Sequence, residues 1–307
     1  MSVTHLALVG PTASGKSALA LAVARALGDV EIVSVDSMQV YRGLDIGTAK
    51  PTPEERAAVP HHLIDVVDAG DAWSVARFQA AAREAVADID RRGKRALLVG
   101  GTGLYVQAVV DDLRFPGEDL GLRAELEAAT TEPGGVAAAH AELRAHDPVA
   151  AERIDPHNAR RIVRALEVVR LTGRPFSSFG DQLTTFGPTA FPVCMVGVWL
   201  TRDVVAERIS RRFAAMRDAG LVEEVRRVGS NGFSRTARQA IGYKEVLAHL
   251  EDGEPSLDDA FDTAVRRTRS FARRQRMWFR RDPRITWFGA VEEPASLLPA
   301  LLAVWGR

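Results

Sequence analysis

The segment LALVGPTASGKSALA, residues 6–20, constrains the fold of this chain more than any other stretch. It sets the pattern G-x-x-x-x-G-K-S, residues 10–17, between a short apolar run and a stretch of helical period. In that context the backbone N–H groups face a phosphate, Lys16 adds a full charge, and the Ser17 hydroxyl is placed to ligate Mg²⁺. The motif predicts a polyphosphate site without saying which polyphosphate it binds. The residues predicted to bind this polyphosphate are Gly10, Pro11, Thr12, Ala13, Ser14, Gly15, Lys16 and Ser17.

Strand and helix patterns alternate after this loop. A second apolar run ends near Asp36, an amphipathic helix with Ser74 as its N-cap is expected over 74–93, and a third apolar run ends at Gly100. Such alternation predicts parallel β-α units. The expected fold class is therefore α/β, with a P-loop parallel-sheet core, helices on both faces, and a site at the carboxyl ends of the strands.

The pattern changes after residue 116. Residues 117–190 are of helical character and end in a loop rich in Gly, Pro, Ser and Thr, and the apolar segment FPVCMVGVWL then resumes strand character. We predict a core in two parts, residues 1–116 and 191–307, interrupted by an inserted all-helical domain at 117–190.

Charge is balanced overall but unevenly distributed. Forty basic residues match forty acidic ones, yet residues 266–284 contain nine arginines and one acid. This segregation predicts a local basic face. No apolar run approaches the roughly 20 residues that span a bilayer. The single cysteine, Cys194, cannot form an internal disulfide, and this favours a cytoplasmic location. Its apolar neighbours predict that it is buried in a strand.

Polar residues follow two of the predicted strands. Asp36 could bind Mg²⁺ or act as a general base, or it could cap a turn. Hydrolysing P-loop enzymes commonly end the third strand in Asp, whereas this chain has Gly100, Gly101 and Thr102 there. This difference argues against an ATPase motor.

Three further features leave alternatives open. Adjacent His61 and His62 are expected to order a loop rather than bind zinc. Arg208 and Arg212 share one helix face and could either close over a phosphate or face solvent. The arginines of the terminal basic segment alternate with aromatic residues, which could stack on RNA or pack in the core.

Seven segments together resemble one family, the tRNA dimethylallyltransferases. They run in the family's order: GPTASGKS, DSMQVYRGLDIGTAKP, VPHHLID, GGTGLY, RIDPHNARRIVRALEV, AIGYKE and RRQRMWFRR. The resemblance extends nearly from end to end of the chain. It implies transfer of a dimethylallyl group from dimethylallyl diphosphate to the N6 amine of adenosine 37 in tRNA, with release of diphosphate.

The resemblance also implies roles for individual residues. Asp36 would accept the proton of the attacking amine, Thr102 would position the reacting groups, and Arg212, helped by Arg208, would hold the leaving diphosphate. Mg²⁺ would lie near Ser17. The adenine would be extruded into a channel lined by residues 37–39.

The implied partners are dimethylallyl diphosphate and the tRNA anticodon stem-loop, which the inserted helical domain would help to bind. No association with a membrane is expected, and the enzyme is expected to be a monomer. A P-loop small-molecule kinase and a non-catalytic RNA-binding ATPase are the alternatives. The tRNA-contacting residues implied by the resemblance are Asp36, Ser37, Met38, Gln39, Thr102, Arg123, Arg160, Arg161, Ile162, Val163, Arg164, Arg238, Gly242, Tyr243, Lys244, Arg273, Arg274, Gln275, Arg276, Trp278 and Arg280.

Overall fold

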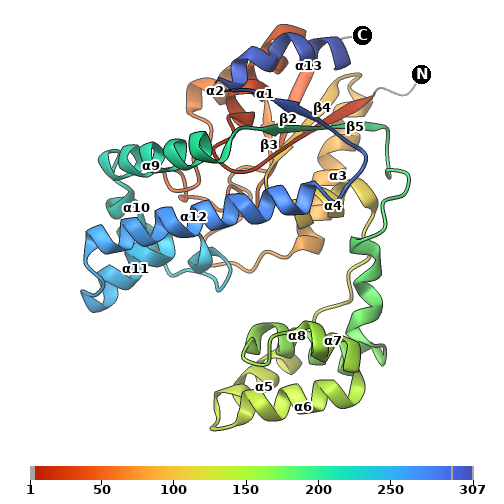
Figure 1. Cartoon of the computed structure of the whole chain (residues 1–307), viewed down its shortest axis with the longest axis vertical. Helices are drawn as coiled ribbons and strands as arrows, with labels where there is room; N and C mark the ends of the chain where they lie inside the picture. The colour runs from red at the N-terminus through yellow and green to blue at the C-terminus, as the bar shows by residue number, and fades with distance from the viewer. Residues whose placement is uncertain (1–3, 292, 306–307) are drawn as a thin grey trace. The chain divides into compact units, whose positions relative to one another are not determined.

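The structure is a computed structural model that describes residues 4–291 and 293–305. The chain divides into two compact units, residues 1–112 together with 188–307, and residues 113–187 (Figure 1). These boundaries lie four and three residues before the predicted 117 and 190.

The larger unit is built on a six-stranded sheet in the order β3-β2-β4-β1-β5-β6. Every strand pair is parallel, which confirms the predicted α/β fold. All five residues of β1 are buried, because this strand lies in the middle of the sheet. The strands are β1 His5–Val9, β2 Val30–Val35, β3 His61–His62, β4 Arg95–Gly100, β5 Val193–Trp199 and β6 Ile285–Gly289.

Helices cover both faces of this sheet. The chain leaves β1 for β2 in one direction and returns from β2 to β4 in the other, so right-handed crossovers place α1 and α3 on opposite faces. In Figure 1, α13 lies on the face of α1 and α4 on that of α3. Ser74 caps α3 as predicted, by accepting the N–H of Arg77. The helices of this unit are α1 Lys16–Leu27, α2 Pro53–Ala58, α3 Val75–Arg91, α4 Gly103–Asp111, α9 Arg202–Asp218, α10 Leu221–Gly229, α11 Tyr243–Asp252, α12 Leu257–Phe279 and α13 Leu298–Trp305.

The smaller unit is helical throughout and has its own apolar core. Leu143, Ile162 and Leu166 are fully buried at its centre. Its helices are α5 Leu120–Thr131, α6 Gly135–His146, α7 Pro148–Arg153 and α8 Ala159–Thr172.

The end of the described chain packs back on its beginning. The indole N–H of Trp305 donates to the carbonyl of Thr4 at 2.7 Å, and Arg95 donates to the carbonyl of Trp305 at 2.6 Å. Pro294, in the short helical turn Pro294–Leu297, lies against the Cα of Gly15. Residues 294 and 305 therefore pack against segments on either side of β1, Trp305 before the strand and Pro294 after it.

Two other observations bear on the sequence-based predictions. Cys194 lies in β5 as predicted, but its side chain is exposed, so the expectation of burial was wrong: the start of β5 extends past its covering elements, and Val193 is only half-buried. Among the residues that the structure describes, no helix combines the length and the apolar character needed to cross a bilayer.

Candidate active site

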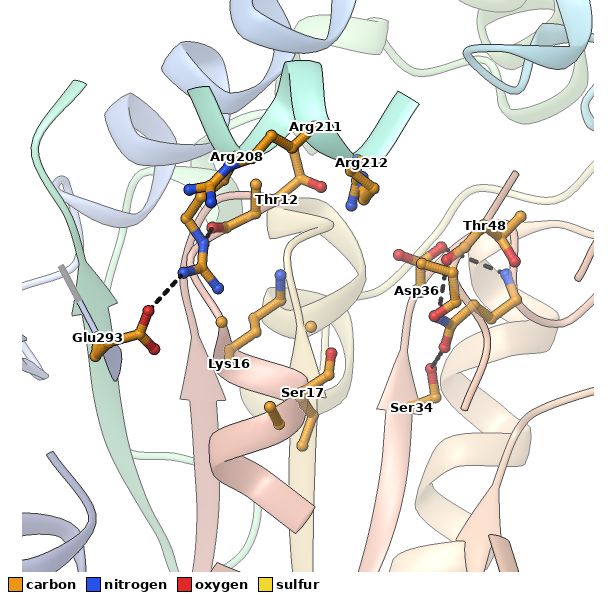
Figure 2. Close-up of a pocket in the computed structure, with 17 residues that line it drawn as sticks. Thr12, Lys16, Ser17, Ser34, Asp36, Thr48, Arg208, Arg211, Arg212 and Glu293 are labelled. Carbon is orange, nitrogen blue, oxygen red and sulfur yellow. Dashed lines mark hydrogen bonds and ion pairs between the residues drawn. The ribbon is translucent and has the colours of Figure 1, made fainter. Parts of the chain in front are cut away.

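A pocket of about 530 Å³ opens at the carboxyl ends of β1, β2 and β4. The P-loop forms one wall, the loop after β2 forms another, and three arginines of α9 close the side above Lys16 (Figure 2). Thr12, Ala13, Gly15, Lys16 and Ser17 line it. The carboxyl edge of a parallel sheet is where α/β folds place their ligands, as the sequence predicted.

The other three residues of the predicted loop lie beneath this lining. Gly10, Pro11 and Ser14 are buried, so they shape the loop and do not face the pocket. A Cβ on Gly10 would approach the carbonyl oxygen of Val198 to 2.6 Å. Gly15 has φ +79°, and a Cβ there would lie 2.4 Å from Pro294. Both positions therefore require glycine.

Lys16 carries the positive charge of the loop in a largely desolvated position. Its ammonium donates to the carbonyl of Pro11 at 3.2 Å. Burial lowers the pKa of Lys16 to about 8, while the Asp36 carboxylate opposes this shift and Arg212 adds to it. A lysine in this state gains its full charge when an anion arrives.

Arg212 is the best-placed cation for a ligand. Its Nε is buried and, within the described part of the chain, has no hydrogen-bond partner. Burial lowers the pKa of the guanidinium, and the charge of Asp36 opposes that shift. A buried donor without a partner is costly unless a ligand satisfies it.

The two neighbouring arginines of α9 also line the pocket. Arg208 donates from Nε to the carbonyl of Ala13 at 3.1 Å and lies 3.7 Å from Glu293. Arg211 is 68% exposed and lies 3.5 Å from Glu207. The alternative that this helix face only meets solvent is therefore wrong, because Arg208 and Arg212 both face the P-loop pocket. Sequence reasoning missed Arg211 and Glu293, for which no motif gives a signal.

Asp36 combines two roles that the sequence left as alternatives. Its Oδ1 accepts the backbone N–H of Met38 at 2.8 Å and that of Gln39 at 3.4 Å, which forms an Asx turn. The same side chain lines the pocket and interacts electrostatically with Lys16 and Arg212. The turn orients the carboxylate and leaves Oδ2 outside these bonds.

Gln39 lines the pocket but is not free to read a base. Its amide nitrogen donates to the carbonyls of Thr48 and Ala49 at 3.1 and 3.2 Å, and its amide oxygen accepts the Ser34 hydroxyl at 2.7 Å. In this structure the Gln39 side chain therefore holds the pocket wall together, and its implied contact with tRNA stays a prediction.

Glu224 supports the same wall from behind. Only 3% exposed, it accepts the backbone N–H groups of residues 45–47 at 2.9 to 3.2 Å. The hydroxyl of Tyr243 donates to the same carboxylate, and burial and Glu224 both raise the pKa of that phenol. Sequence reasoning missed Glu224, which carries no motif.

Two predicted residues lie just outside the lining. Thr102 is the N-cap residue of α4, two positions beyond Gly100, which does line the pocket. Gln275 of α12 is 6% exposed and hydrogen-bonds to the P-loop at Thr12. The structure thus brings Gln275 to the site from a segment expected only to face RNA.

Comparison with known proteins identifies the family. A family model described as "IPP transferase" matches residues 39–282, and one described as "Isopentenyl transferase" matches residues 3–65. The chain belongs to the IPP transferase family. This confirms the resemblance found from the seven motifs.

Individual members of the family are similar along the whole chain. The tRNA dimethylallyltransferase of Kineococcus radiotolerans is 50% identical, over 98% of this chain and 96% of the relative. The crystal structure of the full-length tRNA isopentenylpyrophosphate transferase of Bacillus halodurans is 40% identical, with a TM-score of 0.71, and the match covers 99% of this chain and 95% of that one. A structure of a eukaryotic dimethylallyltransferase acting on tRNA matches with a TM-score of 0.79 at 25% identity, over 100% of this chain and 80% of that one.

The residues implied to contact tRNA by the IPP transferase resemblance fall into distinct groups. Trp278 and Arg276 are half-buried, and Arg276 lies over the ring of Trp199 at 5.3 Å. Ser37 and Met38 are half-buried beside Asp36. The exposed group consists of Arg160, Arg161, Arg238, Lys244, Arg273, Arg274 and Arg280.

For the remaining implied RNA contacts, the structure shows packing roles. Ile162 and Val163 lie in the core of the helical unit, and Gly242, Tyr243 and Gln275 are buried in the larger one. In this structure these residues serve packing, and their implied contact with RNA stays a prediction.

Arg123 and Arg164 share one buried acid. Both bind Glu167, whose side chain is 0% exposed, at 2.9 and 2.8 Å. Arg164 also donates to the carbonyls of Pro116 and Gly117. This network joins α5 to α8, so the main role that the structure shows for these two arginines is to stabilise the helical unit.

The pocket offers Mg²⁺ few protein ligands, which fits the usual way in which proteins bind this ion. No cluster of three His, Cys, Asp or Glu side chains occurs among the described residues. The pocket offers the Ser17 hydroxyl and two carboxylates, Asp36 and Glu293, of which Glu293 lies 3.7 Å from Arg208. Mg²⁺ commonly takes one or two carboxylates together with phosphate oxygens and water.

The adjacent histidines form hydrogen bonds within the fold. His61 bonds the carbonyl of Val59, and His62 bonds Glu31 of β2.

Proposed function

We propose that this protein transfers the dimethylallyl group of dimethylallyl diphosphate to the N6 amine of adenosine 37 in the anticodon loop of tRNA, releasing diphosphate. One observation carries the proposal. Asp36, a carboxylate of the pocket on the loop after β2, faces Lys16 and Arg212 across the P-loop pocket, and the Nε of Arg212 has no hydrogen-bond partner among the described residues. Full-length similarity to tRNA dimethylallyltransferases supports the same substrates.

The side chains divide the work of the transfer. The N6 nitrogen attacks C1 of the dimethylallyl group, the C1–O bond breaks, and its electron pair leaves with the diphosphate. Asp36 takes the proton that N6 releases. Lys16 and Arg212 stabilise the charge that develops on the leaving diphosphate.

Other groups position the reactants. The P-loop binds the diphosphate through the backbone that surrounds Lys16, and Thr102 at the start of α4 orients groups near Asp36. The Ser17 hydroxyl would hold Mg²⁺, which when bound neutralises part of the charge of the diphosphate.

The proposed partners and setting complete the assignment. The exposed arginines of α8 and α12 offer positive charge to the phosphates of the anticodon stem-loop. We expect a monomer, because tRNA supplies the large interface, and a cytoplasmic location, which a single free cysteine favours.

The decisive experiment incubates the protein with dimethylallyl diphosphate and unmodified tRNA and follows the mass of the anticodon-loop nucleoside. The matched variant is Asp36→Asn, whose amide oxygen can still accept the N–H of Met38 and preserve the turn. We expect turnover to fall by about 10²- to 10⁴-fold with tRNA binding retained. Phosphoryl transfer from ATP without a prenylated product would instead identify a kinase, and unchanged turnover in Asp36→Asn would remove the proposed base.

A further inference from the structure

Gln275 connects the basic helix α12 to the P-loop through two hydrogen bonds. Its amide oxygen accepts the backbone N–H of Thr12 at 2.8 Å, and its amide nitrogen donates to the carbonyl of Gly101 at 2.8 Å. Thr12 lines the diphosphate pocket, and Gly101 follows the last residue of β4. One side chain therefore joins three segments that are far apart in sequence.

Two glycines make room for this contact. A Cβ on Gly101 would lie 2.5 Å from the amide nitrogen of Gln275, and a Cβ on Gly103 would lie 2.2 Å from the ring of Trp278. Gln275 and Trp278 lie three residues apart on α12, so they share one face of the helix. The segment GGTG thus forms a track on which α12 docks, and any larger residue at either position would displace it.

The solvent-facing side of α12 is basic, in contrast to its buried side. Arg273 and Arg274, directly before Gln275, are exposed, whereas Ala272 and Phe279 are buried with Gln275. In Figure 1, α12 runs as one continuous helix across the larger unit. The exposed arginines and the buried amide of Gln275 therefore belong to one uninterrupted helix, which connects the basic face to the P-loop.

We propose that Gln275 is a positioning residue that couples RNA bound on the exposed face of α12 to the conformation of the diphosphate loop. The inference rests on the proposed function, because it assumes that the exposed arginines meet tRNA. RNA on this face stabilises the docked helix, the docked helix holds Thr12, and the loop then accepts the prenyl diphosphate more tightly. Linkage requires the reverse effect to be equal, so diphosphate also tightens RNA binding.

Only glutamine supplies both bonds at this position. It accepts from Thr12 and donates to Gly101 at the same time. Methionine has a similar length and makes neither bond, while an ionised glutamate accepts from Thr12 but cannot donate to Gly101. Because Trp278 still packs on Gly103 in such variants, the helix keeps a second anchor.

The test measures pyrophosphate binding by calorimetry, with and without a saturating anticodon stem-loop RNA, in four proteins. These are the wild type, Gln275→Met, Gln275→Glu and Thr268→Val. Thr268 is the matched control: it is buried on the same helix, and its hydroxyl has no hydrogen-bond partner among the described residues. The readout is the ratio of the two pyrophosphate affinities, which a general loss of stability does not change.

In the wild type and in Thr268→Val we expect RNA to tighten pyrophosphate binding by about 5- to 150-fold. In Gln275→Met the ratio should approach one while RNA binding persists. In Gln275→Glu the ratio should rise as the pH is lowered from about 8 to about 5.5, because the protonated carboxyl regains a donor for Gly101. This pH arm compares one protein with itself and so does not depend on the stability of the methionine variant.

Two results would overturn the inference. One is a wild-type ratio near one; the other is an undiminished ratio in Gln275→Met. If RNA is bound and prenylated in either case, the proposed function stands and only the coupling fails. Absence of RNA binding by the wild type would reject both.

Discussion

The hydroxyl of Tyr243 donates a hydrogen bond to the carboxylate of Glu224, which in turn holds the backbone of the loop that carries Thr48 and Ala49. A Cβ on Gly47 would lie 2.3 Å from the Tyr243 ring, so the loop packs directly on this pair. Segments around residues 47, 224 and 243 thereby fix one wall of the active-site pocket. The segment AIGYKE thus serves the pocket from inside the fold.

The first prediction concerns this support. Glu224→Gln turns one acceptor oxygen into a donor that faces the N–H groups of residues 45–47, so we expect the free energy of unfolding to fall by about 1–3 kcal/mol. Denaturant titration measures it. The control is Glu223→Gln, whose carboxylate is 71% exposed and should change stability by less than about 0.5 kcal/mol. Equal effects of the two changes would contradict the role assigned to Glu224.

The second prediction separates the arginines of α9. Arg212→Gln removes the buried cation whose Nε is unpartnered among the described residues, and we expect kcat/KM for dimethylallyl diphosphate to fall by about 10²- to 10³-fold. Arg211→Gln removes a cation of the same pocket that is 68% exposed, and the loss should be at least tenfold smaller. Steady-state kinetics with saturating tRNA provides the comparison. A larger loss in Arg211→Gln would reverse the assignment.

The third prediction follows from the pKa of Lys16, which burial lowers to about 8 in the free protein. Bound diphosphate favours the ammonium form and raises this pKa, so binding takes up a proton above pH 8. Affinity for pyrophosphate should therefore fall as the pH rises past 8, by up to about tenfold per pH unit. Lys16→Arg is the control, because its side chain stays charged over this pH range. The ionisation of pyrophosphate itself affects both proteins equally and cancels in the ratio of their affinities. A constant affinity ratio between wild type and Lys16→Arg over this range would disprove the linkage.

The fourth prediction distinguishes surface from structural arginines in the helical unit. Replacing exposed Arg160 and Arg161 by Gln should weaken tRNA binding and reduce its salt dependence by about one counterion per lost phosphate contact, without loss of stability. Arg123→Gln should instead destabilise the unit by about 1–3 kcal/mol, since it removes a partner of buried Glu167. Binding at several salt concentrations, together with thermal melting, tests both. Unchanged salt dependence in the surface variant would exclude these two arginines as phosphate contacts.

The sequence predicted what local pattern encodes. Apolar runs located β1, β2, β4 and β5, the P-loop motif located the phosphate cradle, and Asp36 followed from its place after a strand. The short strand β3 was missed, because its residues His61 and His62 were expected to order a loop. Side-chain partners across the fold could not be predicted in this way. Thr12 and Gln275 are 263 residues apart in the sequence. Neither the P-loop motif nor the basic segment around Gln275 indicates that the two residues form a hydrogen bond.

Burial of polar side chains explains what the sequence could not show about the site. Gln39 and Tyr243 are polar residues in motifs of an RNA-modifying family, which favours reading them as RNA contacts. In the structure their polar atoms bind Ser34, Thr48 and Glu224 instead. A single sequence does not show whether a polar group meets a ligand or satisfies the backbone of its own fold.

The contact of Pro294 with Gly15 has a consequence for the order in which the enzyme becomes active. During synthesis, the ribosome makes the P-loop among the first residues, but the segment that covers it emerges some 280 residues later. A product of premature termination before residue 293 would carry the complete phosphate-binding motif and lack the residues that close over it. Such fragments would lack the packing of Pro294 on Gly15 and the approach of Glu293 to Arg208, so one side of the pocket is completed only by the last residues to be made.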